Sequence, residues 1–257
     1  MDAGLAAALA VASLMLAGWL LSLAVRDVSI IDILWGLGFV LLAWVVFVGA
    51  DGSDARRTLL LILVTVWGLR LSGYLAWRNI GEAEDFRYRE MRERHGARFP
   101  LVSLITVFAL QGVAMWVVSL PVQEGMDAPT PAGLGLLDFL GIAVWAIGLT
   151  FEGLGDFQLA RFKADDANTG QVMDRGLWRY TRHPNYFGDF MVWWGIYLIA
   201  LSTGDAWWTI VSPLVMSVLL MRVSGVGMLE KTIGERRPAY AEYKRRTSTF
   251  FPRPPKP

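Results

Sequence analysis

The chain has 257 residues, of which 54% are hydrophobic, and its mean hydropathy is +0.42. Soluble domains are less apolar and seldom contain several apolar runs of about 20 residues, the length that crosses a bilayer. A net charge of +1 provides no general attraction to nucleic acid, and the absence of cysteine excludes disulfides, thiolate metal sites and cysteine nucleophiles. The composition therefore indicates an integral membrane protein.

Apolar runs, taken in chain order, predict an all-α polytopic membrane protein with seven transmembrane helices in a single membrane domain, 1–257. The first run lacks the basic segment that precedes a signal peptide's apolar core and is too long for such a core, so we interpret it as a span. The expected spans are Leu5–Val25, Ile30–Val48, Leu59–Trp77, Leu101–Leu120, Leu134–Phe157, Tyr186–Leu201 and Trp207–Leu229.

The loops differ sharply in their content of arginine and lysine. Basic residues gather in 78–98, in 161–182 and after 229, whereas 121–138 and 202–206 contain none. Because short loops that carry Lys and Arg stay inside, the pattern predicts an outside N-terminus and a cytoplasmic C-terminus. Arg56 and Arg57 are the exception, since they would fall on the outer side.

Charged side chains near the middle of a span cost roughly 2.5–3.5 kcal/mol, so each one marks a candidate site. The alternative is that such residues pair to hold helices together, as Asp32 could with Arg70. Because five spans carry them, we favour a polar cavity that opens to the cytoplasm. The polar and charged residues are Asp32 in the second span, Arg70, Tyr74 and Arg78 in the third, Asp156 and Lys163 in the fifth, Asn185 and Asp189 in the sixth, and Glu230 in the seventh.

The densest polar stretch, GLWRYTRHPNYFGD at 176–189, stands where the sixth span begins. Pro184 suits the first turn of a helix, whose unpaired N–H groups bind anions. Neighbouring arginines would strengthen a phosphate site, although a basic belt for acidic lipids is the alternative. Extra donors and acceptors favour a nucleotide-like ligand. The candidates are Arg179, Tyr180, Arg182, His183, Asn185, Tyr186 and Asp189.

Other ligand motifs are missing from the sequence. His95 and His183 are the only histidines, so we expect no histidine-rich metal site. There is also no Walker loop, and no glycine-rich fingerprint follows a strand. Phosphates would therefore have to be held by the ends of membrane helices and by loops.

The stretch GLWRYTRHPNYFGD, with GDFQLARFK before it and MLEKTIGERRPAYAEYKRRTSTFFP after it, resembles the C-terminal domain of the steroid 5-alpha-reductase family. DILWGLGF, WGLRLSGYLAWR and EDFRYREMRE resemble its bacterial branch, the DUF1295 family. The resemblance implies a seven-helix enzyme of the bacterial inner membrane that takes NADPH from the cytoplasm. It would reduce an activated C=C bond of a hydrophobic, steroid-like or lipid enone. It implies substrate-side helices in 1–125 and a cofactor-binding part in 132–257.

Site residues follow from the resemblance and from the polar residues together. The eukaryotic reductases hold the substrate ketone with a Glu and a Tyr, and that glutamate motif is missing here. We therefore expect Asp32 with Tyr74 or Arg70 to be the catalytic group. The expected cofactor-binding residues are Arg78, Arg87, Asp156, Lys163, Arg179, Tyr180, Arg182, His183, Asn185, Tyr186, Asp189 and Glu230.

Two further interpretations remain open. RHPNY and the C-terminal tail also resemble the isoprenylcysteine carboxyl methyltransferases, which bind S-adenosylmethionine, although the EDFRY segment favours the reductase. A transporter or lipid-binding membrane protein is the third possibility. Transporters usually repeat their polar helices in two halves, and these polar residues gather at one face. Expected partners are membrane lipids and a hydrophobic small-molecule or lipid substrate, with no nucleic acid, and the sequence does not set the oligomeric state.

Overall fold

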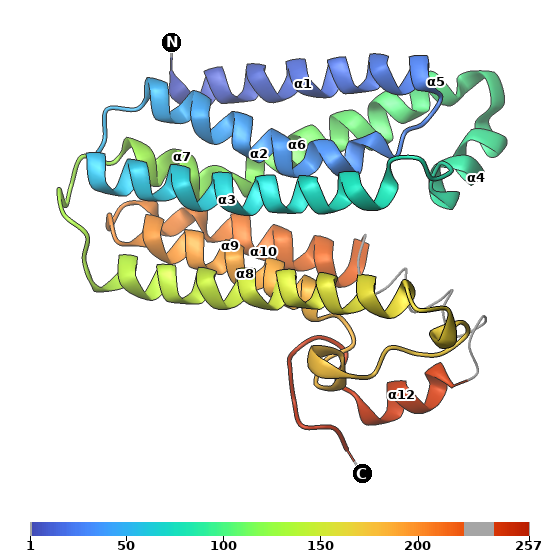
Figure 1. The fold of residues 1–257 in the computed structure, drawn as a ribbon. Helices are drawn as coiled ribbons and strands as arrows, with labels where there is room; N and C mark the ends of the chain where they lie inside the picture. The colour runs from blue at the N-terminus through green and yellow to red at the C-terminus, as the bar shows by residue number, and fades with distance from the viewer. Residues whose placement is uncertain (1, 224–238, 257) are drawn as a thin grey trace. The chain divides into compact units, whose positions relative to one another are not determined.

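The computed structural model describes residues 2–223 and 239–256, and within these ranges every regular element is a helix (Figure 1). The described residues form no strand, and one isolated bridge joins Thr181 to Ser248. Five helical stretches are long and apolar enough to cross a membrane: Ala3–Val25, Ile30–Gly49, Asp54–Asn79, Phe86–Asp127 and Leu136–Lys163. The protein is therefore a membrane protein that is all-helical in the residues that the structure describes.

The chain divides into two compact units, which are described separately: 1–136 with 199–209, and 137–198 with 210–257. The first unit begins with three long helices, α1 (Ala3–Val25), α2 (Ile30–Gly49) and α3 (Asp54–Asn79). They coincide with the first three expected spans, although α3 begins more than a turn before Leu59. The helix α2 packs against both of the others.

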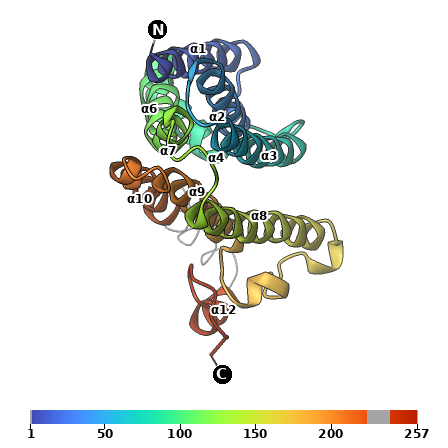
Figure 2. The same ribbon diagram turned by 90° about the vertical axis from the view of Figure 1, so that its left-hand side faces the viewer.

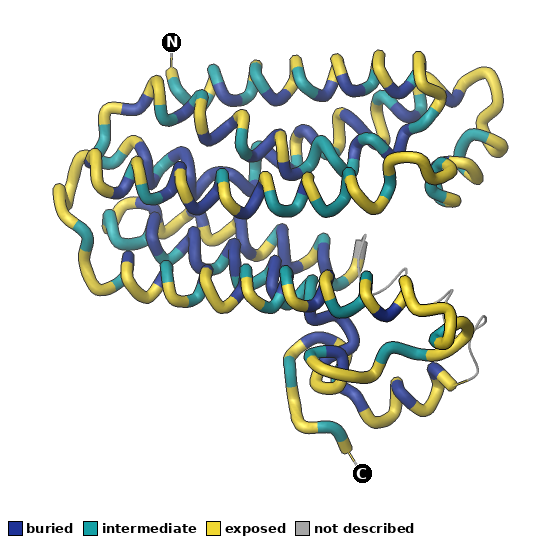
Figure 3. Tube along the Cα trace, viewed as in Figure 1, coloured by how far each residue is buried: buried dark blue, intermediate teal, exposed yellow. Residues whose placement is uncertain are grey.

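The capped ends and the exposed surface of α1 are those of a helix that crosses a bilayer. The Asp2 carboxylate accepts a bond from the backbone of Leu5 (3.0 Å) at the start of α1, and Arg26, in the left-handed region (φ 59°), ends the helix. One side of α1 is exposed along its length, at Leu5, Leu9, Leu16 and Leu20 among others (Figure 3). An exposed leucine row of this length suits lipid better than water.

The fourth apolar run belongs to a longer helical stretch, Phe86–Asp127. The expected span Leu101–Leu120 lies inside it. Gly96 (φ 50°) separates the first helix from the rest, and residues 104–109 widen into a π-helical turn. In chain order the stretch contains α4 (Phe86–His95), α5 (Phe99–Ser103), the π-helix Leu104–Ala109, α6 (Leu110–Val118) and α7 (Leu120–Asp127).

The two arginines that conflict with the charge pattern are held by the fold of the first unit. Arg56 is fully buried, and its guanidinium donates to Ser202 Oγ (3.0 Å) and to the carbonyls of Pro131 (3.2 Å) and Gly133 (3.3 Å). Arg57 bonds to Asp54 (2.6 Å) on the surface of the same helix. Arg56 therefore has a structural role that its position in the sequence does not reveal.

The second unit is built on α8 (Leu136–Lys163) and α9 (Pro184–Leu201). The expected fifth span ends six residues before α8 does, and the expected sixth span starts two residues after α9 begins. Helices α10 (Val211–Val218) and α12 (Tyr240–Arg246) follow. The last expected span, Trp207–Leu229, is described only in part, and Glu230 lies outside the described residues.

Helices α8 and α9 meet at glycines. A Cβ atom added to Gly148 would lie 2.6 Å from the Gly188 carbonyl oxygen, and one added to Gly195 would lie 2.6 Å from that of Gly141. Such distances leave no room for a side chain, so the two backbones are in direct contact. This contact sets the first turn of α9 against α8 and so positions the residues around Asn185.

Candidate functional site

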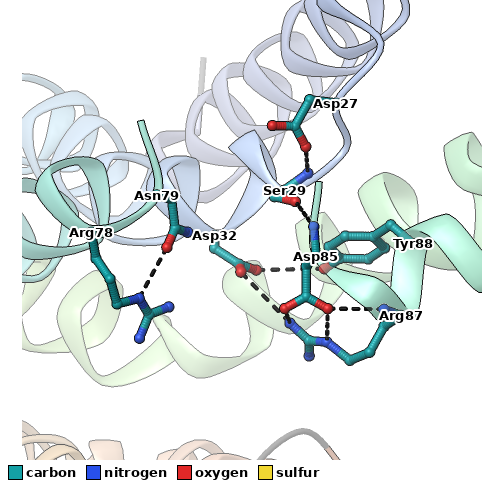
Figure 4. Close-up of polar contacts among 8 residues, drawn as sticks. All are labelled: Asp27, Ser29, Asp32, Arg78, Asn79, Asp85, Arg87 and Tyr88. Carbon is teal, nitrogen blue, oxygen red and sulfur yellow. Dashed lines mark hydrogen bonds and ion pairs between the residues drawn. The ribbon is translucent and has the colours of Figure 1, made fainter. Parts of the chain in front are cut away.

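A partly buried polar cluster joins α2 to α4 in the first unit (Figure 4). Asp32, in the first turn of α2, accepts a hydrogen bond from the Tyr88 hydroxyl (3.4 Å) and pairs with the Arg87 guanidinium (3.7 Å). The Tyr88 side chain is buried, and its ring also lies beneath Arg87 (5.3 Å). Asp32, Arg87 and Tyr88, the Asp32 cluster hereafter, unite a carboxylate, a phenol and a cation.

Asp85 positions Arg87 within this cluster. Its carboxylate caps α4 by accepting from the Arg87 backbone (3.0 Å), and it binds the Arg87 guanidinium through both oxygens (2.8 and 3.2 Å). Its own N–H donates to Ser29 Oγ (2.8 Å) at the start of α2. Burial alone would raise the pKa of Asp85, but the bonds and charge of Arg87 lower it below its ordinary value. Asp85 is therefore a carboxylate near neutral pH.

Glu84 fixes the same segment to the turn between α1 and α2. Its carboxylate accepts from the Val28 backbone (2.9 Å) and from two nitrogens of Arg92 (2.7 and 3.1 Å). The Arg92 guanidinium also stacks on Phe99 (4.2 Å). Glu84 and Asp85 thus fasten the start of α4 to Val28 and Ser29, just before α2. These contacts keep Tyr88 against Asp32.

Of the partners expected for Asp32 in α3, Tyr74 makes other contacts. Among the described residues, Asp32 bonds to Arg87 and Tyr88, and the pairing with Arg70 or Tyr74 is not formed. Tyr74 packs against Trp77 (6.0 Å) and carries the guanidinium of exposed Arg78 over its ring (5.7 Å). The structure therefore joins Asp32 to Arg87, and it adds Tyr88, which was not among the expected site residues.

A second cluster surrounds the start of α9 in the second unit. Helix α9 begins at Pro184, as its ring geometry favours, and Asn185 donates to the buried carboxylate of Asp156 (3.1 Å). The His183 ring stacks on Tyr186 (5.6 Å, 9°). Asp189 lies buried one turn further along α9, whereas Lys163 is exposed at the end of α8. Most of the residues expected from RHPNYFGD are thus brought together.

The two arginines of this stretch differ. Arg179 and Tyr180 are exposed at the surface. Arg182 is buried, and its guanidinium donates to the carbonyls of Lys244 (2.9 Å) and Thr247 (2.7 Å) and to Thr249 Oγ1 (2.7 Å). Arg182 therefore holds the C-terminal segment, residues 240–256, which we call the C-terminal hook. A phosphate could reach Arg182 only if some of these bonds broke.

The residues that sequence reasoning missed are Glu84, Asp85, Tyr88 and Arg92. All four belong to EDFRYREMRE, the segment in which the sequence predicts Arg87 alone as a site residue. Acidic residues and arginines alternate in this segment, and this pattern was the sequence signal for ion pairs among them. The distance in sequence between Asp32 and Tyr88 gave no indication that they meet.

Comparison with known proteins shows the family. A family model described as "Protein of unknown function (DUF1295)" matches residues 18–247. "Uncharacterized protein C594.04c" of Schizosaccharomyces pombe (strain 972 / ATCC 24843) is 24% identical over 262 residues, which cover 91% of this chain and 75% of the relative. No solved structure matches significantly. The link to the steroid 5-alpha-reductases remains a prediction, and the chain belongs to the DUF1295 family.

Proposed function

We propose that this protein is an NADPH-dependent membrane reductase that adds hydride to the activated C=C bond of a hydrophobic enone, steroid-like or lipid. The observation that carries the proposal is the Asp32 cluster. A buried phenol held by a carboxylate and a guanidinium can stabilise negative charge on a carbonyl oxygen. Reduction of an enone develops this charge when hydride adds to the β-carbon.

Tyr88 takes the role of hydrogen-bond donor to the substrate carbonyl in this proposal. To do so its hydroxyl, which has one proton, turns from Asp32 to the substrate. The Arg87 guanidinium pairs with the Asp32 carboxylate and offsets the charge that moves from the double bond to the oxygen. A proton from water then completes the product at the α-carbon. Tyr74 is the alternative donor, because it was expected from the sequence and lies beside a cation.

The second unit supplies the residues that suit NADPH. Bound NADPH would provide the hydride. Exposed Arg179 and Lys163 could pair with its phosphates, and the first turn of α9 offers N–H groups beside Asn185. Arg182 does not fit as a direct phosphate ligand, because its guanidinium is bonded to the C-terminal hook. We therefore assign Arg182 to positioning this segment.

The first test is direct binding of NADPH, and separately of S-adenosylmethionine, to the detergent-purified chain by calorimetry. NADPH binding that weakens in Asn185→Ala is expected. Binding of S-adenosylmethionine alone would replace the reductase by a methyltransferase of the isoprenylcysteine type. Failure to bind either, with solute movement in reconstituted vesicles, would favour a transporter.

The second test separates the two tyrosines. With an enone that the protein reduces, Tyr88→Phe should lower kcat by about 10²-fold, the scale of one lost oxyanion donor, and leave NADPH affinity unchanged. Tyr74→Phe is the matched control and should retain turnover. The opposite result would return the catalytic role to Tyr74.

We also propose the full topology: seven spans, an outside N-terminus, a cytoplasmic C-terminus, and location in a bacterial inner membrane with the cofactor residues facing the cytoplasm. The distribution of basic loop residues supports this orientation. Cysteines introduced singly at loop positions into this cysteine-free chain would test it by labelling from either side of the membrane.

A further inference from the structure

The C-terminal hook presents an exposed cationic face. Arg245, Arg246, Arg253 and Lys256 are all exposed, and Glu242 is the one acidic residue among the hook's residues. The Lys256 backbone donates to the Arg246 carbonyl (2.9 Å), which brings the two ends of the hook together. The positive charges therefore lie close to one another on a folded segment.

The opposite face of the hook is fixed to the segment before α9. Tyr240, Tyr243 and Phe250 are buried, and the Tyr243 hydroxyl donates to the Trp178 carbonyl. The Arg253 backbone donates to the carbonyl of Tyr180 (3.0 Å). Because aromatic residues anchor one face, the cationic face is directed away from the unit and is available to a partner.

The position of the hook suits a membrane surface. The residues that hold it, 178–182, directly precede the first turn of α9, and α9 is in backbone contact with α8, a candidate span. In Figures 1 and 2 the hook lies to one side of α8 and not in line with its axis. Tyr180, whose carbonyl accepts from the Arg253 backbone, and Phe251, two residues before Arg253, are 44% and 48% exposed. Aromatic side chains are typical of the headgroup level.

We propose that the cationic face of the C-terminal hook binds acidic phospholipid headgroups in the leaflet that surrounds α8 and α9. Clustered Lys and Arg beside a membrane helix are attracted to acidic headgroups, and the attraction falls within a Debye length. The exposed aromatic residues add insertion into the interface. This inference depends on the chain being a membrane protein and does not depend on the reductase activity.

The test uses a single cysteine at exposed Ala241, one turn before Arg245, since the chain contains no other cysteine. The labelled full-length protein is placed in nanodiscs of phosphatidylcholine with increasing phosphatidylglycerol and a trace of headgroup-nitroxide lipid. Quenching of the fluorophore should rise with the acidic lipid and be reversed at about 1 M salt, where the Debye length is about 3 Å.

Charge variants decide the outcome. Changing Arg245, Arg253 and Lys256 to Gln should weaken the attraction on the order of a hundredfold, since each lost cation weakens it on the order of fivefold. Quenching in this variant should therefore not rise over the range of acidic lipid in which the parent chain responds. The matched control changes the exposed Arg89, Arg94 and Arg98 to Gln and should behave as the parent chain. Equal quenching in acidic and neutral nanodiscs, or equal effects of the two triple variants, would overturn the proposal. If the hook variant unfolds, the lipid and salt dependence of the parent chain decides.

Discussion

Replacing Arg182 by lysine distinguishes the structural role of this arginine from the phosphate-binding role that the sequence suggested. The substitution keeps the positive charge but replaces a forked guanidinium by one ammonium group. In the structure the fork makes three bonds of 2.7–2.9 Å to Lys244, Thr247 and Thr249, and the side chain is 5% exposed. A single ammonium cannot reproduce this geometry.

The magnitude follows from the bonds that are lost. Hydrogen bonds to a charged group contribute about 1.5–3 kcal/mol each, and breaking a buried charged network typically costs about 3–5 kcal/mol in total. If lysine retains one of the three bonds, Arg182→Lys should destabilise the ligand-free protein by about 3–4 kcal/mol. Arg179→Lys is the matched control, and because Arg179 is exposed its effect on stability should be within about 0.5 kcal/mol.

The assay pairs thermal unfolding of the ligand-free protein in detergent with NADPH affinity. We expect Arg182→Lys to lower the unfolding midpoint before any cofactor is added, and we expect Arg179→Lys to weaken NADPH binding at an unchanged midpoint. An Arg182→Lys protein with the parent midpoint and at least tenfold weaker NADPH binding would refute the structural role and restore Arg182 as a phosphate ligand.

Three other changes test the packing and the charges. Gly188→Ala, whose Cβ would lie 2.5 Å from a carbonyl oxygen of α8, should destabilise the protein by about 1–3 kcal/mol, whereas Gly73→Ala in the open on α3 should be neutral or stabilising by up to about 1 kcal/mol. Arg56→Gln should lower the thermal midpoint far more than Arg57→Gln, because Arg56 alone of the two is fully buried. The pKa of Asp85 is lowered in the folded protein, so its stabilising contribution is present above about pH 4 and is lost as the pH falls further. Asp85→Asn should therefore flatten the loss of stability below about pH 4. Thermal midpoints at a series of pH values would measure this.

Helix positions followed well from the sequence because they depend on local information. Apolar length and breaking residues placed α1 and α2 almost to the residue, and Pro184 marked the start of α9. The stretch Phe86–Asp127 was harder to predict, since the charged residues of α4 resemble a loop although Asp85 caps them into a helix.

The partners of polar residues could not be predicted in the same way. Asp32 was placed with Arg70 or Tyr74 by analogy with the Glu and Tyr of the eukaryotic reductases, because helical spacing relates residues only within one span and cannot pair residues of different helices. Its contact with Tyr88 depends on two acidic residues that fasten α4 to the turn before α2, and this is a tertiary arrangement. Likewise, the sequence gives no reason why Arg182 should be buried while Arg179 is exposed.

Arg56 bears on the proposed orientation of the chain in the membrane, because its place in the sequence conflicts with the distribution of basic residues among the loops. Its bonds connect the N-terminal end of α3 to residues 131–133, which follow α7, and to Ser202, which follows α9. These three places must therefore lie on the same side of the membrane. In the seven-span topology the third span begins, and the fourth and sixth spans end, on one side, as these bonds require. Apart from Arg57, the loops on that side contain no other basic residue. The buried arginine therefore agrees with the proposed topology, and carbonyl groups compensate its charge where it lies.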